Sequence, residues 1–366
     1  MKKKLIFFLP NFSPGGAGKS ILNMCKYLDK KKYDLYIISL NKNYYKIELK
    51  KYCKKIYEIN SNKTFISFFK IVKILENFDK KNTTFISNIN YANVLSIIFL
   101  KIFKSYKLII TERTPFQELN YFYSKSDFFK KKIIKYLIFI LYKKADLVIC
   151  NSKNNSVDLG NFIKKKCHYV YPIFPDKISK SRTFIIKSQK INILSIGRYS
   201  REKNFLNIIK SISLIDNKNI RLFLVGDGIE KDNLKNYIKK HRVRAKLIKY
   251  TNENEIKYLK KSHIFISSSD FEGFPNIVVQ AINYSLPILS SESHGGINEI
   301  LLNGKGGTFY NKKDIIDLSN KINHLIKNYK LSTKKTLRAK SQIKRFLPHI
   351  STKKFEYLLK KLDKHF

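Results

Sequence analysis

Three carboxylates lie within the thirty residues between Phe271 and Ile300, and two of them lie beside glycine turns. Glu272 precedes a Gly-Phe-Pro turn and a stretch of helical periodicity, and Glu299 follows the Gly-Gly turn that begins at Gly295. The first turn of a helix attracts anions because its N–H groups lack partners within the helix and the macrodipole is positive there. Carboxylates beside such a turn can accept hydrogen bonds from neutral hydroxyl groups. The segment therefore predicts a ligand that carries both a phosphate and a sugar.

A cluster of basic residues follows a short apolar run that ends at Gly197. Arg198 comes directly after this glycine, and Lys203 lies where we expect the next helix to begin. A guanidinium fork and an ammonium group can together hold a diphosphate and stabilise the charge that develops on a departing phosphate. Because the chain has only nine arginines and many lysines, Arg198 is the stronger candidate. Ordinary surface charge is the alternative interpretation of Lys203.

Two further pairs of glycines follow apolar runs. Gly226 and Gly228 enclose an aspartate, a spacing typical of either a ligand-binding loop or a tight turn between a strand and a helix. Gly15 and Gly16 lie in a segment that ends in Gly-Lys-Ser, but Ser13 stands where a P-loop has its first glycine. No apolar strand ending in a magnesium-binding aspartate follows, so we do not predict an ATPase site.

Short apolar runs bounded by turns alternate with stretches of helical periodicity, which predicts an α/β fold with buried parallel strands. Phe205, Ile208 and Ile212, for example, repeat on one face of a helix expected over Lys203–Leu214. The first set of expected strands comprises Leu5–Leu9, Leu35–Leu40, Thr84–Ser87, Leu108–Thr111, Leu147–Cys150 and Tyr169–Tyr171. The second set comprises Ile191–Ile196, Arg221–Val225, Lys246–Tyr250, Ile264–Ser267, Pro287–Ser290 and Gly307–Phe309.

The two sets of strands predict two domains, in keeping with the length of 366 residues. The stretch between the sets is polar and contains two prolines, as is typical of a linker. We therefore expect an N-terminal Rossmann-like domain over 1–172, a linker over 173–189, a C-terminal Rossmann-like domain over 190–349 and a final helix over 350–366.

The segment around Glu272 resembles the donor site of the family 4 glycosyltransferases, which are retaining enzymes with the GT-B fold. The family signature is a glutamate, a Gly-Phe turn and a second glutamate eight residues after the first, a position that Gln280 occupies here. The resemblance covers most of the chain and is strongest over 191–310. It implies two Rossmann-like domains whose parallel sheets face a central cleft, with the final helix packing back on the N-terminal domain.

The resemblance implies a nucleotide-sugar donor, with a UDP-linked sugar favoured, and assigns the catalytic roles to three residues. Arg198 and Lys203 would hold the diphosphate, and Glu272 would orient the hydroxyls of the sugar. The other substrate contacts that it implies are Gly15, Gly16, Gly197, Gly226, Gly228, Gly273, Phe274, Pro275, Asn276, Ile277, Gln280, Gly295, Gly296 and Glu299. It implies no enzyme nucleophile, and the sequence has no DxD motif, so we expect no metal and no other cofactor.

Gln280 is a departure from the family pattern. A carboxylate can accept both hydrogen bonds of a vicinal diol such as that of ribose, whereas a neutral amide offers one acceptor oxygen and two donor protons. We therefore expect donor binding that is weaker or differently oriented. A catalytically weak GT-B protein that serves as a binding or partner subunit is the alternative.

Polar residues also end two of the expected N-terminal strands. Glu112 and Arg113 resemble a Glu-Arg pair in the N-terminal domain of some O-antigen-type family members, and a local ion pair is the alternative. Asn88 and Asn90 fall where many members have a histidine near the acceptor. The acceptor implied by the resemblance is a saccharide or a lipid-linked saccharide.

The formal charge of +46 favours an anionic partner, although AT-rich codon usage would explain part of the lysine excess. No nucleic-acid-binding motif is present, so we expect no nucleic-acid partner. The stretch 128–144 has an apolar and aromatic centre between basic clusters, which suits a helix on an anionic membrane surface. A buried helix with charged ends is the alternative. Membrane-associated family members that use lipid-linked acceptors often carry such a patch.

The sequence and the family resemblance also give an expected cellular location and biosynthetic pathway. No signal peptide is evident, no apolar stretch reaches the roughly 18 residues that span a bilayer, and the four cysteines are scattered along the sequence. We expect a cytoplasmic protein, with peripheral attachment to the inner face of the cytoplasmic membrane if 128–144 binds lipid. The expected function is retaining transfer of a hexose or N-acetylhexosamine during assembly of a bacterial surface polysaccharide.

Overall fold

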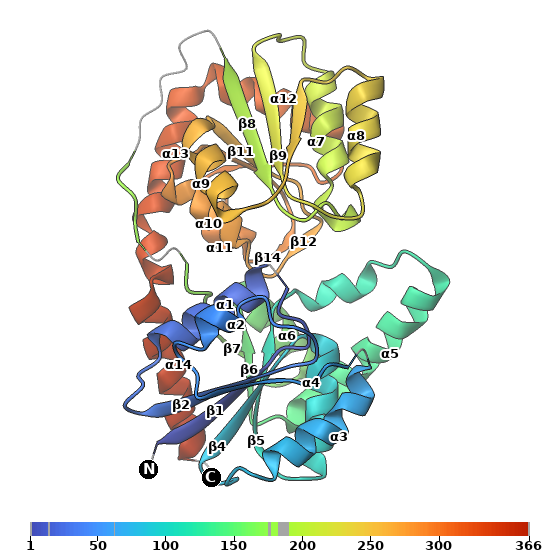
Figure 1. The fold of residues 1–366 in the computed structure, drawn as a ribbon. Coiled ribbons are helices and arrows are strands. Elements are labelled where there is room, and N and C mark those ends of the chain that lie inside the picture. The colour runs from blue at the N-terminus through green and yellow to red at the C-terminus, as the bar shows by residue number, and fades with distance from the viewer. Residues whose placement is uncertain (1, 14, 62, 175–176, 182–189, 365–366) are drawn as a thin grey trace. The chain divides into compact units, whose positions relative to one another are not determined.

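The structure is a computed structural model that describes residues 2–13, 15–61, 63–174, 177–181 and 190–364. The chain forms two compact units, of which the first combines Met1–Phe174 with Phe346–Phe366 and the second comprises Pro175–Arg345 (Figure 1). Of the expected linker, residues 175–176 and 182–189 lie outside the described residues.

The first unit is built on a seven-stranded sheet in the order β3-β2-β1-β4-β5-β6-β7, and its described strand pairs are all parallel. The strands are β1 Lys3–Phe8, β2 Tyr33–Ser39, β3 Lys55–Glu58, β4 Thr83–Asn88, β5 Lys107–Glu112, β6 Leu147–Cys150 and β7 His168–Tyr169. The helices are α1 Gly16–Tyr27, α2 Lys46–Leu49, α3 Thr64–Leu75, α4 Asn90–Ser96, the π-helical η1 Ile97–Ile102, the 3-10 turns η2 Phe116–Asn120 and η3 Tyr142–Lys144, α5 Lys125–Leu141, α6 Lys153–Ile163 and α14 Pro348–Asp363.

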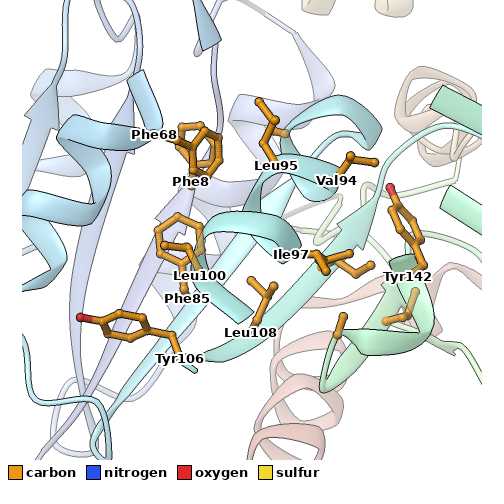
Figure 2. Packing of buried hydrophobic residues seen from close by; sticks show 14 of the residues in the cluster. Phe8, Phe68, Phe85, Val94, Leu95, Ile97, Leu100, Tyr106, Leu108 and Tyr142 are labelled. Carbon is orange, nitrogen blue, oxygen red and sulfur yellow. The ribbon is translucent and has the colours of Figure 1, made fainter. Parts of the chain in front are cut away.

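Successive residues of a strand point to opposite sides of the sheet. Apolar clusters lie on both faces of this sheet, as is typical of parallel sheets. Leu5 and Phe7 of β1 belong to one apolar cluster, whereas Phe8 belongs to the other. Figure 2 shows the cluster that contains Phe8, together with Phe68, Leu95 and the η1 residues Ile97 and Leu100. The apolar runs of the sequence are thus strands buried on two sides.

The last helix, α14, packs within the first unit. Phe355, Leu358 and Leu359 join the same apolar cluster as Phe7. The carboxylate of Asp363 forms an ion pair with Lys3 and another with Lys107, at 3.4 Å from the Lys107 ammonium nitrogen. The chain therefore returns to the first unit at Phe346, a few residues before the helix boundary expected from the sequence.

The second unit has a six-stranded parallel sheet in the order β10-β9-β8-β11-β13-β15 and a separate two-stranded sheet of β12 and β14. The strands are β8 Ile191–Ile196, β9 Ile220–Val225, β10 Ala245–Ile248, β11 Ile264–Ser267, β12 Phe271–Glu272, β13 Ile288–Ser291, β14 His294–Gly295 and β15 Thr308–Tyr310. The helices are the 3-10 turn η4 Arg201–Lys203, α7 Phe205–Ser213, α8 Lys231–Lys240, α9 Asn252–Lys261, α10 Asn276–Asn283, α11 Ile297–Ile300, α12 Ile315–Lys327 and α13 Tyr329–Ser341, followed by the 3-10 turn η5 Ile343–Phe346.

The structure confirms the predicted fold class, two Rossmann-like units with parallel sheets. Every strand expected from the sequence is present, with ends shifted by no more than two residues. The strand β3 and the short pair β12 and β14 were not expected from the sequence. No helix among the described residues is long and apolar enough to cross a membrane.

Candidate functional site

The polar residues predicted in the second half of the chain follow the carboxyl ends of neighbouring strands in the second unit. Gly197 follows β8, Glu272 follows β11 and Gly295 follows β13. In open α/β sheets, ligands bind outside the carboxyl ends of the strands, because the connecting loops and helix N-termini converge there. The sheet therefore brings three separate sequence motifs to one edge.

Glu272 is held by two side chains from earlier in the chain. The hydroxyl of Ser269 donates a hydrogen bond of 2.8 Å to Glu272 Oε1, and the ammonium group of Lys203 forms an ion pair with the same oxygen. Both charged side chains are about four-fifths shielded from solvent. Ser269 was not among the residues predicted for the site, although a run of serines at the end of β11 is a signal for side-chain hydrogen bonding.

The position of Lys203 differs from the sequence prediction. We expected Lys203 at the start of a helix, but it lies in η4, Asn204 follows with a left-handed φ of 49°, and α7 begins only at Phe205. Two hydrogen bonds to Ser268 fix this turn: Asn204 Nδ2 donates to the Ser268 carbonyl at 3.2 Å, and the Ser268 hydroxyl donates to the Lys203 carbonyl. The turn aims the Lys203 side chain past Gly197 toward Glu272.

A two-stranded parallel sheet fixes Glu272 beside the Gly-Gly turn. In it Phe271 pairs with His294, and Glu272 pairs with Gly295 (Figure 1). Gly295 has a φ of 111°, and a Cβ there would lie 1.6 Å from the carbonyl oxygen of Glu272. Only glycine fits this close approach. The N–H of Gly296 donates to the carbonyl of Gly273 at 3.0 Å, so that group is already used within the protein.

Helix α10 carries two buried acceptor oxygens that have no hydrogen-bond partner within the described residues. These are Oδ1 of Asn276, the first residue of the helix, and Oε1 of Gln280, one turn later. Residues four apart lie on the same face of a helix. A buried acceptor without a donor costs about 1–3 kcal/mol, so this face is suited to a ligand that supplies hydroxyl protons.

Arg198 is an exposed cation in the loop after β8, and within the described residues it has no acidic partner. The neighbouring loop with Gly226 and Gly228 packs against the backbone of this loop. A Cβ on Gly226 would lie 2.0 Å from the Gly197 carbonyl oxygen, and one on Gly228 would lie 2.5 Å from that of Tyr199. The tight-turn interpretation therefore accounts for both glycines.

The remaining predicted residues divide between the site and its surroundings. Phe274 and Pro275 are buried in the turn that leads into α10, where Ile277 is half-buried. Glu299 lies in the short helix α11, and its carbonyl accepts a hydrogen bond from the Arg345 side chain.

Gly15 and Gly16 belong to the first unit, where the N–H of Gly15 donates to the Tyr45 hydroxyl at 3.3 Å. Within the described parts of both units, no three His, Cys, Asp or Glu side chains are grouped closely enough to hold a metal ion.

Two family models match this chain and together cover both units. Residues 14–173 match the model described as Glycosyltransferase Family 4, and residues 176–342 match the model described as Glycosyl transferases group 1. The chain belongs to the family 4 glycosyltransferases. The resemblance inferred from Glu272 and the turn that follows it is thereby confirmed.

The relatives of this family 4 chain include bacterial glycosyltransferases. It is 28% identical over 312 residues to a Campylobacter jejuni protein named N-acetylgalactosamine-N,N'-diacetylbacillosaminyl-diphospho-undecaprenol 4-alpha-N-acetylgalactosaminyltransferase, covering 81% of this chain and 83% of the relative. It is 22% identical over 306 residues to the amylovoran biosynthesis glycosyltransferase AmsD of Erwinia amylovora, with the same coverage of each chain.

Solved structures share the fold of the family 4 chain. The HepE protein of Anabaena, solved in complex with UDP and glucose, has a TM-score of 0.80 at 16% identity over 98% of this chain and 100% of its own. Sucrose-phosphate synthase of Thermosynechococcus elongatus has a TM-score of 0.82 at 12% identity over the full length of both chains. At such low identity these likenesses show the fold alone.

Proposed function

We propose that the protein is a retaining glycosyltransferase that moves a hexose or N-acetylhexosamine from a UDP-linked donor to a saccharide or lipid-linked acceptor. The proposed pathway is the assembly of a bacterial surface polysaccharide, in keeping with the names of the Campylobacter and Erwinia relatives. The observation that carries the proposal is the placement of Glu272, held by Ser269 and Lys203, beside the Gly295 turn at the carboxyl edge of the sheet.

The chemistry of these groups fits a sugar diphosphate. Arg198 has no acidic partner among the described residues, and Lys203 has only Glu272. A diphosphate would bind both cations and draw Lys203 away from Glu272, which would free the carboxylate to accept hydrogen bonds from the sugar hydroxyls. The same cations would stabilise the charge on the departing UDP. The proposed reaction uses no metal and no enzyme nucleophile, so chelation with EDTA should leave the rate unchanged.

Binding of UDP tests the donor site directly. We expect UDP to raise the melting temperature more than GDP or ADP does, because the proposed donor is UDP-linked. A ligand at 100 times its Kd stabilises the folded state by about 2.7 kcal/mol. Arg198→Ala should abolish the rise. Arg201→Ala is the matched control, because the Arg201 side chain is 61% exposed and faces Glu230 at 3.5 Å. An unchanged UDP shift in Arg198→Ala would remove this arginine from the site.

Gln280 should set the affinity for the nucleotide. We expect Gln280→Glu to bind UDP several-fold more tightly, because a carboxylate can accept hydrogen bonds from both ribose hydroxyls whereas the amide accepts through Oε1 alone. Isothermal titration of both proteins with UDP measures the difference. Gln342→Glu makes the same chemical change at an exposed position and should have no effect.

The same variant separates the proposed enzyme from a catalytically weak binding subunit. Equal or weaker UDP binding by Gln280→Glu would place Gln280 outside the ribose contact. If the native protein binds UDP-sugars without releasing UDP and Gln280→Glu gains turnover, the weak or inactive alternative is correct.

We further propose that α5 attaches the protein to an anionic membrane. Ile138 is the one buried residue of this helix, so α5 is not a buried helix with charged ends. Phe129, Ile133 and Tyr136 are 64%, 59% and 64% exposed and follow one another on one face of the helix. Exposed lysines at 130, 132, 143 and 144 flank this face, as is typical of helices that lie in the interface of an acidic bilayer.

A cavity beside α5 supports the same proposal. Its volume is about 370 Å³, and phenylalanines form much of its lining, among them Phe122, Phe128 and Phe139. Lys132 and Lys135 also line it. An apolar hollow with nearby ammonium groups suits a lipid chain below an anionic headgroup.

Liposome sedimentation tests the membrane contact. The protein should sediment with vesicles that contain phosphatidylglycerol and not with neutral vesicles, and salt should weaken the association. Ile133→Glu should lower binding at least tenfold, because it places a carboxylate within the apolar face. Ile229→Glu is the control, since Ile229 is 84% exposed in the other unit. Equal loss in the two variants would refute a specific contact by α5, and salt-sensitive binding to DNA but not to vesicles would indicate a nucleic-acid partner.

A further inference from the structure

A half-buried cation, Arg113, lies at the carboxyl edge of the sheet in the first unit. Arg113 directly follows β5, and its Nε and Nη2 donate to Oδ1 of Asn88 at 3.0 and 2.8 Å. Its Nη1 donates to the hydroxyl of Ser20 at 2.7 Å. Both acceptors are neutral, so these hydrogen bonds orient the guanidinium group without balancing its charge.

The neighbouring carboxylate of Glu112 attracts this cation electrostatically, but among the described residues the two side chains form neither a hydrogen bond nor a close ion pair. Glu112 is the last residue of β5, and it accepts its hydrogen bonds from the Tyr142 hydroxyl and from Asn93 Nδ2, the latter at 3.0 Å. Burial raises the pKa of Glu112 to about 7, so this carboxyl is only partly ionised at neutral pH. Within the described residues, no carboxylate accepts a hydrogen bond from Arg113.

Arg113 nevertheless keeps its charge. Burial lowers the pKa of its guanidinium group to about 10, which leaves it protonated at neutral pH. Charges that are shielded from water in folded proteins are normally paired, because desolvating an ion costs free energy. A half-buried guanidinium group held only by neutral oxygens therefore suits an anion that binds from outside the protein.

The position of this cation in the sheet also points to a ligand. In the strand order β3-β2-β1-β4-β5-β6-β7, the direction of winding reverses between β1 and β4. Ligands of open α/β sheets bind at the carboxyl ends of the strands at such a reversal. Asn88 ends β4, and Ser20 lies in α1, the helix that follows β1, so Arg113 is held at this point.

Hydrogen-bond donors remain available there. A guanidinium group has five N–H bonds, and three of those of Arg113 are used. The Ser20 hydroxyl accepts from Arg113 and has no acceptor for its own proton among the described residues. A cavity of about 40 Å³ has room for one oxygen atom of a ligand. Arg113, Ser20, Asn151 and Glu112 contribute polar groups to its lining, and most of the other lining residues are apolar.

We propose that Arg113 and Ser20 bind a phosphate oxyanion of the acceptor substrate. The inference rests on the proposed transferase function, for which it specifies an acceptor that carries a phosphate, attached either to a lipid or to a sugar. Two guanidinium N–H groups and one hydroxyl proton match the several oxygen acceptors of a phosphate group.

A matched pair of variants tests the charge of the site. Ser20→Asp places a carboxylate beside Nη1 of Arg113, which balances the cation from within and repels phosphate, whereas Ser20→Asn adds similar bulk without charge. The full chain with Arg198→Ala is titrated with inorganic pyrophosphate at constant ionic strength, so that the donor site contributes little. We expect Ser20→Asp to bind pyrophosphate at least tenfold more weakly than Ser20→Asn, because both variants lose the hydroxyl donor but only the first adds a negative charge.

Three outcomes would overturn the proposal: no pyrophosphate binding by the Arg198→Ala background, equal binding by the two Ser20 variants, or equal binding of acetate. If both Ser20 variants fail to fold, Arg113→Gln gives the same test, with a tenfold loss expected and no loss contradicting the site. Titrations with a sugar 1-phosphate and with a short prenyl phosphate then distinguish the two sources of the phosphate. No nucleotide is present, so these results are independent of the UDP test of the proposed function.

Discussion

Glu272→Gln should lower the rate of sugar transfer by about two to three orders of magnitude, the loss typical when one group that stabilises a transition state is removed. The amide has nearly the shape of the carboxylate but no charge, so it accepts more weakly from the sugar hydroxyls and no longer balances Lys203. UDP release from a UDP-sugar, followed together with UDP affinity, measures the effect. UDP affinity should stay within a few-fold of the native value, because Arg198 and Lys203 remain.

Glu292→Gln is the matched control, since Glu292 is an exposed carboxylate near the same turn. Its transfer rate should equal that of the native protein. A native rate in Glu272→Gln would show that this carboxylate does not act on the donor sugar, and the assignment of the site would then fail. Loss of UDP binding together with activity would instead place Glu272 in nucleotide binding.

Gly295→Ala should both destabilise the second unit and remove activity. The new Cβ would lie 1.6 Å from the Glu272 carbonyl oxygen, in a residue whose φ of 111° already disfavours any side chain. The strand pair that joins Glu272 to Gly295 must then separate, at a cost of about 1–3 kcal/mol for such overpacking. Urea unfolding measures the change in the free energy of unfolding, and UDP release measures the loss of activity.

Gly304→Ala separates backbone strain from the clash. Gly304 also has a positive φ, of 87°, but the nearest atom to its added Cβ lies at 3.7 Å, an ordinary contact. We expect this variant to lose stability by about 1 kcal/mol and to keep its activity. If Gly295→Ala behaves like Gly304→Ala, the strand pair does not hold Glu272 in place.

The architecture could be predicted because parallel strands that are buried on both faces appear in the sequence as continuous apolar runs. The strands β6, β8 and β11 were predicted to the residue for this reason. The strand β3, with the sequence KIYE, was missed because it lies at the edge of its sheet and is only half apolar. The pair β12 and β14 has two residues in each strand, which is too short for any periodic pattern.

Contacts between distant residues could not be predicted in the same way. The ion pair between Lys203 and Glu272 spans 69 positions and depends on the left-handed turn at Asn204, which we had expected to be helical. The sequence also does not show which side chains of an apolar helix are buried. The stretch 128–144 is compatible with a buried or an exposed helix, and only the folded structure shows that Phe129 is exposed to solvent. Glu112 and Arg113 are adjacent in the chain, yet Glu112 bonds to Tyr142 and Asn93 whereas Arg113 bonds to Asn88 and Ser20.

The two-domain α/β fold, the family and the segment that holds Glu272 could be inferred from the residues alone, because apolar runs and local turn residues act over short stretches of chain. Which charged groups meet depends on the folded chain. Among the described residues, folding pairs Lys203 with Glu272, leaves Oδ1 of Asn276 and Oε1 of Gln280 without donors, and holds the half-buried Arg113 by neutral oxygens. The physical reason is that these contacts depend on which loops the sheets bring to one edge, and the sheet order is fixed by packing over the whole domain.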